Sequence, residues 1–135
     1  MRTYNVNVET ANGREDVQLR LTLQGQINLK KKHKKNATEL VFDAIDDCEL
    51  MADILTEALN FKGNTNTIKT GAELYDAIAD TADGVNGFCD VLLGIAVDSA
   101  LISVKQADII RKGLDGAVDE AMATLEDKVE GNGKN

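Results

Sequence analysis

The sequence of 135 residues predicts an α+β fold that is mainly α-helical, with an N-terminal β-hairpin packed on about four helices. Near the N-terminus, apolar and polar residues alternate, which is typical of strands. From residue 50 onward, apolar residues recur every three or four positions, which is typical of amphipathic helices. The chain has no proline and only 4% aromatic residues, so Leu, Ile, Val and Ala must build the core, and this composition favours helices.

The first element is the hairpin, predicted within residues 1–24. Its apolar residues fall on every second position: Tyr4, Val6, Val8, Val17, Leu19, Leu21 and Leu23. Between the two runs, Asn12-Gly13 suits the positive φ angles of a tight turn, although the flanking residues Glu9 to Asp16 also allow a longer loop. An isolated two-stranded hairpin is marginal in water, so its apolar face must rest on the helical part of the chain.

The middle of the chain gives signals of unequal strength. Residues 24–35 begin with helix-like spacing at Ile27 and Leu29 and continue into a lysine run, which leaves their structure open. Residues 38–45 are too short a run for periodicity to separate strand from helix, and we expect a third strand there. Asp46-Asp47 then offers an N-cap to a helix reaching Phe61, with a regular apolar face: Leu50, Met51, Ile54, Leu55, Ala58 and Leu59.

The second half predicts three more helices within a single domain that covers residues 1–130, of which 25–130 are mainly helical. After a loop at 63–67, the capping box from Thr70 to Glu73 begins a helix that ends at Gly84. Residues 85–102 are apolar nearly all round, which indicates a helix buried on most sides. A second capping box, from Ser103 to Gln106, begins the last helix, and residues 131–135 form a disordered tail.

Charge is distributed unevenly along the chain. The net charge is −8, but residues 1–38 hold eight basic and three acidic residues (+5), whereas residues 39–135 hold seven and twenty (−13). The lysine run within residues 30–35 is either a solvated helix face or an electrostatic contact with the acidic surface of a neighbouring copy or a partner. It lacks the interleaved aromatic residues of nucleic-acid sites, and the acidic body would repel phosphate, so nucleic acid is disfavoured. The basic residues concerned are Lys30, Lys31, Lys32, Lys34 and Lys35.

Residues suited to catalysis or metal binding are sparse. The single histidine, His33, lies among lysines, where the neighbouring positive charges disfavour its protonation, so no catalytic triad can be assembled with it. Cys48 and Cys89 fall in apolar segments and are expected to be free, buried thiols. Asp76, Asp80 and Asp83 would share one helix face and could bind a hard cation, although a solvated acidic face is far commoner. We therefore expect no enzyme, no cofactor and no metal site.

The chain contains no segment that predicts export or a membrane span. It begins directly with an alternating polar pattern, and no run approaches the roughly 18 apolar residues of a membrane helix. We expect a cytoplasmic protein.

One longer pattern resembles a known family. Its segments are Leu55-Thr56-Glu57-Ala58-Leu59-Asn60, Gly63-Asn64, Thr70-Gly71-Ala72-Glu73-Leu74-Tyr75-Asp76, Gly84-Val85, Gly87-Phe88, Ile95-Ala96 and Ser99-Ala100-Leu101-Ile102. Together they resemble the tail assembly chaperones of long-tailed, siphovirus-type phages and prophages of Gram-positive bacteria. The upstream lysine-rich segment and the stretch with Phe42-Asp43 and Asp46-Asp47 are also similar, so the resemblance covers roughly residues 20–103. It departs from the family pattern at Ala100, where glycine is more familiar.

This resemblance implies a small non-enzymatic protein of the bacterial cytoplasm. Such a chaperone binds the tape-measure protein, helps to recruit major tail tube subunits, and is not retained in the mature virion. We also expect it to self-associate. The alternatives are a structural minor tail or head–tail joining protein of the virion and a cytosolic enzyme of unknown type.

The favoured contact with the tape-measure protein is the apolar stripe of the last helix, where small residues permit another helix to approach closely. An intramolecular core is an equal alternative for this stripe. Its residues are Ile110, Leu114, Ala117, Ala121, Leu125 and Val129.

Overall fold

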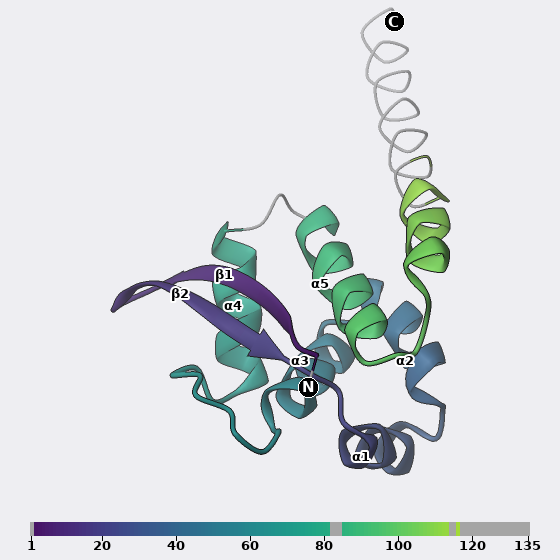
Figure 1. The fold of residues 1–135 in the computed structure, drawn as a ribbon, viewed down its shortest axis with the longest axis horizontal. Coiled ribbons are helices and arrows are strands. Elements are labelled where there is room, and N and C mark those ends of the chain that lie inside the picture. Colours follow the sequence, from purple (N-terminus) through teal and green to yellow (C-terminus); the bar gives the residue numbers. More distant parts are fainter. Residues whose placement is uncertain (1, 82–84, 114–115, 117–135) are drawn as a thin grey trace, which may run out of the picture. The chain divides into compact units, whose positions relative to one another are not determined.

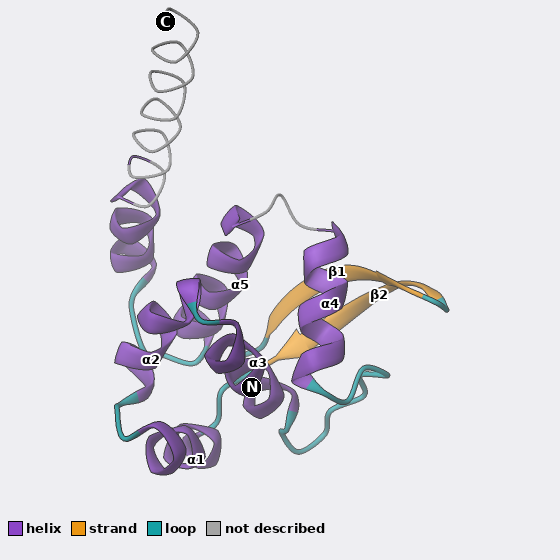
Figure 2. Cartoon of the chain, turned by 180° about the vertical axis from the view of Figure 1, so that it is seen from behind, coloured by secondary structure: helices purple, strands orange, loops and turns teal. Residues whose placement is uncertain are grey.

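The computed structural model describes residues 2–81, 85–113 and 116 (Figures 1 and 2). The chain divides into two compact units, residues 1–102 and 103–135. The first unit confirms the predicted α+β, mainly helical class, whereas the single domain over 1–130 stays a prediction. Its elements are β1 (Tyr4–Thr10), β2 (Gly13–Leu19), α1 (Leu23–His33), α2 (Ala37–Asp43), the 3₁₀ helix η1 (Ala44–Asp46), α3 (Cys48–Leu59), α4 (Gly71–Thr81) and α5 (Val85–Asp98).

The hairpin forms as predicted, with corrected ends. β1 and β2 are antiparallel, and Thr10 pairs with Gly13, so the turn is Ala11-Asn12 and not Asn12-Gly13. Gly13 takes the positive φ of 104°. The strand ends at Leu19, and the expected extension to Leu23 is wrong because Leu23 already begins α1. The apolar face of the hairpin rests on the helices, with β1 against α4 and α5 and β2 against α3 (Figure 2).

The helix predicted after Asp46-Asp47 is α3, which ends at Leu59 instead of Phe61. The Leu50 backbone N–H donates to the Asp47 side chain at 3.1 Å, which confirms the cap. All six predicted apolar residues of its face are buried. α3 contacts α1, α2, α4 and β2, so it holds the first unit together.

The expected third strand at 38–45 is wrong, because this segment forms α2 and η1. The buried residues of α2 and η1 are Ala37, Leu40, Val41 and Ala44. Counted from Ala37 they stand three, four and seven positions on, so they share one face of a helix. The open segment 24–35 resolves into α1. The N–H of Gly25 donates to Thr22 Oγ1 at 3.1 Å at its start, and Lys34, with φ of 64°, ends it.

The crossing of α3 and α4 depends on Gly71. A Cβ at this position would lie 2.0 Å from the backbone oxygen of Ala52, so no side chain fits there. The predicted cap is present, since the Glu73 N–H donates to Thr70 Oγ1 at 3.2 Å. The predicted end at Gly84 lies outside the described residues.

The predicted helix over 85–102 is α5, which ends earlier, at Asp98. Among the described residues of α5 Asp90 alone is exposed, as expected for a helix buried on most sides, and six side chains are fully buried: Cys89, Val91, Leu92, Leu93, Ile95 and Ala96. It closes with Ala100 at φ of 63° and a hydrogen bond from the Leu101 N–H to the Ala96 oxygen at 2.8 Å. Ala100 thus lies at a left-handed position, where glycine fits best.

In the second unit, the predicted capping box is confirmed in both directions. The Ser103 N–H donates to Gln106 Oε1 at 2.8 Å, and the Gln106 N–H donates to Ser103 Oγ at 3.1 Å. Residues 104–113 are helical. The predicted tail at 131–135 lies outside the described residues.

Candidate functional site

An apolar groove lies between α1 and the start of α2, and we call it the α1–α2 groove. Its volume is about 330 Å³, and its walls are Leu23, Gln26, Ile27, Lys30, Asn36, Ala37, Thr38 and Leu101. Leu23 is 73% exposed and Ile27 is 37% exposed. These two residues are one helical turn apart, so α1 presents an apolar strip to the groove. Exposed apolar strips of this kind mark interaction sites more often than scattered single residues do.

The predicted lysine run borders this groove, but it does not act as one charged block. Lys32 Nζ lies 2.9 Å from Asp53 Oδ2, and Lys35 Nζ lies 2.9 Å from Asp43 Oδ2. In the described part of the chain, Lys30, Lys31 and Lys34 are exposed and make no ion pair. These three residues, which we call the basic rim, are the part of the run available to a partner.

His33 has a carboxylate partner that the sequence did not reveal. Its Nε2 lies 2.8 Å from Asp53 Oδ2, and the same oxygen forms the ion pair with Lys32 Nζ. Partial burial raises the pKa of the Asp53 carboxyl, but the hydrogen bonds from Lys32 and His33 outweigh this effect and hold the pKa below its ordinary value of 3.8. This cluster therefore ties the end of α1 to the middle of α3.

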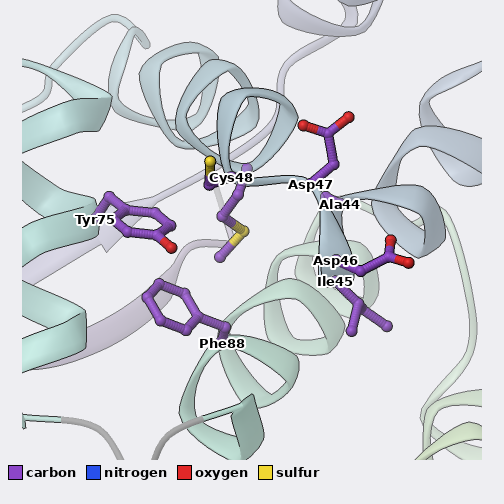
Figure 3. Close-up of a pocket in the computed structure, with 8 residues that line it drawn as sticks. Ala44, Ile45, Asp46, Asp47, Cys48, Tyr75 and Phe88 are labelled. Atoms are coloured by element: carbon purple, nitrogen blue, oxygen red, sulfur yellow. The ribbon is translucent and has the colours of Figure 1, made fainter.

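A second hollow of about 280 Å³, the aromatic pocket, lies between η1, the start of α3, α4 and α5. Tyr75 and Phe88 stack at 4.7 Å between ring centroids on one side of it, and the carboxylates of Asp46 and Asp47 lie on the other (Figure 3). Cys48 also lines this pocket and is exposed, so its predicted burial is wrong. As the first residue of α3, Cys48 precedes the buried apolar face of that helix, whereas Cys89 is buried as predicted.

The predicted acidic helix face forms part of a third hollow, of about 410 Å³, between the hairpin turn and α4. Asp76 and Asp80 line it together with Glu9 and Glu73, and Asp83 lies outside the described residues. Among the residues that the structure describes, no cluster of three or more His, Cys, Asp or Glu side chains could hold a metal ion.

Most of the predicted partner-binding stripe cannot be placed. Ile110 lies in the helix at 104–113 and is half-buried, while Leu114, Ala117, Ala121, Leu125 and Val129 lie outside the described residues. In the same helix, Val104 and Ile109 are exposed. The second unit therefore also carries apolar side chains that its described residues do not cover.

Within residues 2–81, 85–113 and 116, no helix is long and apolar enough to cross a membrane. Comparison with protein-family models, with curated proteins and with solved structures gave no match to the chain. An apolar groove beside a basic rim is suited to binding an amphipathic helix.

Proposed function

We propose that this protein is a tail assembly chaperone that binds the tape-measure protein and helps to recruit major tail tube subunits in the cytoplasm of a bacterial host. The observation that carries the proposal is the α1–α2 groove, where Leu23 is 73% exposed beside Ile27. The resemblance over roughly residues 20–103 supplies the identity of the client.

The physical basis of the proposal is that the chaperone covers apolar surface of the tape-measure protein. A tape-measure chain is long and largely helical, and it exposes apolar stripes before the tail tube encloses it. Leu23 and Ile27 are spaced to meet residues one turn apart on a client helix. The basic rim beside them favours a client stretch that also carries acidic residues, and this charge fixes orientation more than it adds affinity.

Co-expression with the tape-measure protein tests the proposal. We expect the two chains to co-purify and the tape-measure protein to become more soluble. The variant Ile27→Asp should lose this effect. Phe42→Asp is the matched control, because Phe42 is also 37% exposed but does not line the groove. If the wild-type chain neither co-purifies with the tape-measure protein nor raises its solubility, the proposal is wrong.

Purified phage particles separate the chaperone from its main alternative. A chaperone should be missing from the mature virion, whereas a minor tail or head–tail joining protein should be present in a fixed number of copies. Quantitative mass spectrometry of particles makes this distinction directly.

A further inference from the structure

The two edges of the β-hairpin differ in how their backbone groups are satisfied. Gln18 in β2 forms two hydrogen bonds away from the hairpin: its N–H donates to Asn66 Oδ1 at 2.8 Å, and its carbonyl oxygen accepts from Asn66 Nδ2 at 2.7 Å. Asn66 is only 6% exposed, and its side chain takes the place of a neighbouring strand at this point. The Thr67 hydroxyl also donates to the Glu15 carboxylate of β2. The loop before α4 therefore covers part of the outer edge of β2.

The outer edge of β1 has no such cover. In an antiparallel pair, the backbone groups of successive residues point alternately toward the partner strand and away from it. Gln18 pairs with Asn5, so the backbone groups of Asn5 also point away from the partner strand. The same holds two and four residues later, at Asn7 and Glu9. Within the described part of the chain, the backbone N–H and C=O groups of these three exposed residues have no hydrogen-bond partner.

β1 also lacks the features by which an edge strand usually avoids pairing with a further strand. Such strands are very short or carry proline, lysine or a bulge. β1 has seven residues in unbroken register with β2, it contains neither proline nor lysine, and its one charged residue, Glu9, pairs with Arg14. On its inner face Val6 is only half-buried, whereas Val8 and Val17 are buried. A further strand beside β1 would pair with the open backbone groups and cover Val6.

The surroundings of this edge are acidic. α4 crosses the hairpin, and its C-terminal end stands beyond the outer edge of β1 (Figures 1 and 2). β1 contributes Glu9 and Thr10 to the third hollow, and β2 contributes none of the described walls. The opposite wall is α4, with exposed carboxylates at Glu73, Asp76 and Asp80. In the described part of the chain these three carboxylates make no ion pair, so they favour a partner segment with basic side chains.

We propose that the outer edge of β1 binds an extended, basic segment of a partner protein as a third strand of the sheet. The backbone of this segment pairs with Asn5, Asn7 and Glu9, an apolar side chain covers Val6, and basic residues near the turn meet the acidic wall of α4. A second copy of this chain is disfavoured at this edge, because it would bring two acidic α4 walls together. The edge is separate from the α1–α2 groove, so the inference goes beyond the proposed function and does not depend on it.

A synthetic peptide added to the full chain tests the inference by amide hydrogen exchange. The peptide is blocked at both ends, alternates valine with threonine, and carries lysines at each end. In the free chain, the amides of Asn7 and Glu9 should exchange faster than those of Val6 and Val8, which point toward β2. At saturation the peptide should slow exchange at Asn7 and Glu9 by about tenfold or more. The same peptide with every backbone nitrogen methylated should not bind, because it has no N–H groups to donate.

A pair of proline variants separates the two edges of the hairpin. Asn7→Pro removes an N–H on the outer edge of β1, and Asp16→Pro removes the N–H of its cross-strand partner on the other edge. Both variants lose the hydrogen bond from Asn7 Nδ2 to Asp16 Oδ1 at 2.7 Å, so they are matched in that respect. Asn7→Pro should weaken peptide binding by about tenfold or more, whereas Asp16→Pro should bind as the wild type does. Circular dichroism should confirm that both variants are folded, and the methylated peptide decides the question if Asn7→Pro is not.

Charge variants test the acidic wall without changing the strand. Asp76→Asn together with Asp80→Asn alters exposed side chains only, and it should weaken peptide binding about fivefold and reduce its salt dependence. Ile27→Asp in the α1–α2 groove should bind the peptide normally, so loss of tape-measure binding in that variant tests the proposed function separately.

Three results would overturn the inference. They are a wild-type chain that does not bind the peptide, a methylated peptide that binds equally well, and a folded Asn7→Pro variant with unchanged affinity. Exchange at Asn7 that slows when the chain alone is concentrated would mean that a second copy occupies the edge, and this would overturn the inference as well.

Discussion

The helices α1 and α3 begin alike and end up in different roles. They have 11 and 12 residues, and in both a side chain accepts a hydrogen bond of 3.1 Å from a backbone N–H at the start of the helix. α3 buries its whole apolar face, whereas α1 buries Gly25 and Leu29 and leaves Leu23 and Ile27 exposed. The cap decides where each helix starts, but only the surroundings decide what its apolar face contacts.

This difference separates a helix that holds the fold together from one that can bind a partner. α3 is surrounded by the hairpin and its neighbouring helices, so its apolar side chains contribute to the free energy of folding. Leu23 on α1 lines a groove and is 73% exposed, so it contributes little to folding and leaves apolar area available for binding.

The largest expected effect tests this contrast directly. Leu55 in α3 is 0% exposed, so Leu55→Ala should lower the free energy of unfolding by about 2–5 kcal/mol. Leu23→Ala in α1 should change it by no more than about 0.5 kcal/mol. Urea unfolding followed by circular dichroism measures both. If the two variants were equally destabilised, α1 would belong to the core and the contrast would fail.

Glycines sharpen the same contrast. A Cβ at Gly71 would collide with the backbone of α3, so Gly71→Ala must push α4 away and should cost about 1–3 kcal/mol or more. A Cβ at Gly25 would meet the flexible end of Leu21 at 3.3 Å, and alanine favours the helix, so Gly25→Ala should stay within about 1 kcal/mol of the wild type. Thermal unfolding of the two variants side by side gives the comparison, and a mild Gly71→Ala would show that α3 and α4 can separate.

Much of the fold could be predicted because its signals are local. Asp47 and the six apolar residues after it define α3 within twelve positions, and the alternation from Tyr4 to Leu19 defines the hairpin. The third strand at 38–45 was predicted wrongly because a short apolar run has no clear period. Its burial as a helix depends on neighbours that are distant in sequence.

The groove was harder to predict than the fold. Leu23 continues the alternation of the hairpin, so the pattern assigned it to a strand, although it begins α1. Leu101 reaches the groove from a position 78 residues later in the chain, and no periodicity connects the two. The same holds for the Asp53 cluster, since Lys32 and His33 lie 21 and 20 positions before their partner. The sequence shows the lysine run, but it does not show which of these lysines form ion pairs in the folded chain.

Substitutions at the residues that follow the helices should change the stability of the chain by a smaller amount. Lys34 after α1 and Ala100 after α5 have φ angles of 64° and 63°, which strain a residue with a Cβ, whereas Asn60 after α3 has a φ of −96°. Lys34→Gly and Ala100→Gly should each stabilise the chain by about 1 kcal/mol. Asn60→Gly should give no such gain, because no strain is relieved there. Melting temperatures compare the three variants, and an equal gain at Asn60 would mean that glycine acts through something other than the left-handed backbone.

The smallest effect concerns the cluster that joins the two compared helices. Because the pKa of Asp53 in the folded chain lies below 3.8, its pairing with Lys32 and His33 contributes stability that is present in full above this value and is lost as the pH falls through the lowered pKa. Asp53→Asn cannot make this contribution at any pH. The wild type should therefore be more stable than the variant near neutral pH, and the difference should shrink when the pH drops below 3.8. Urea midpoints measured across this acid range test the link. A difference that stayed constant with pH would mean that α1 is held to α3 by packing around Leu29 and not by this charge cluster.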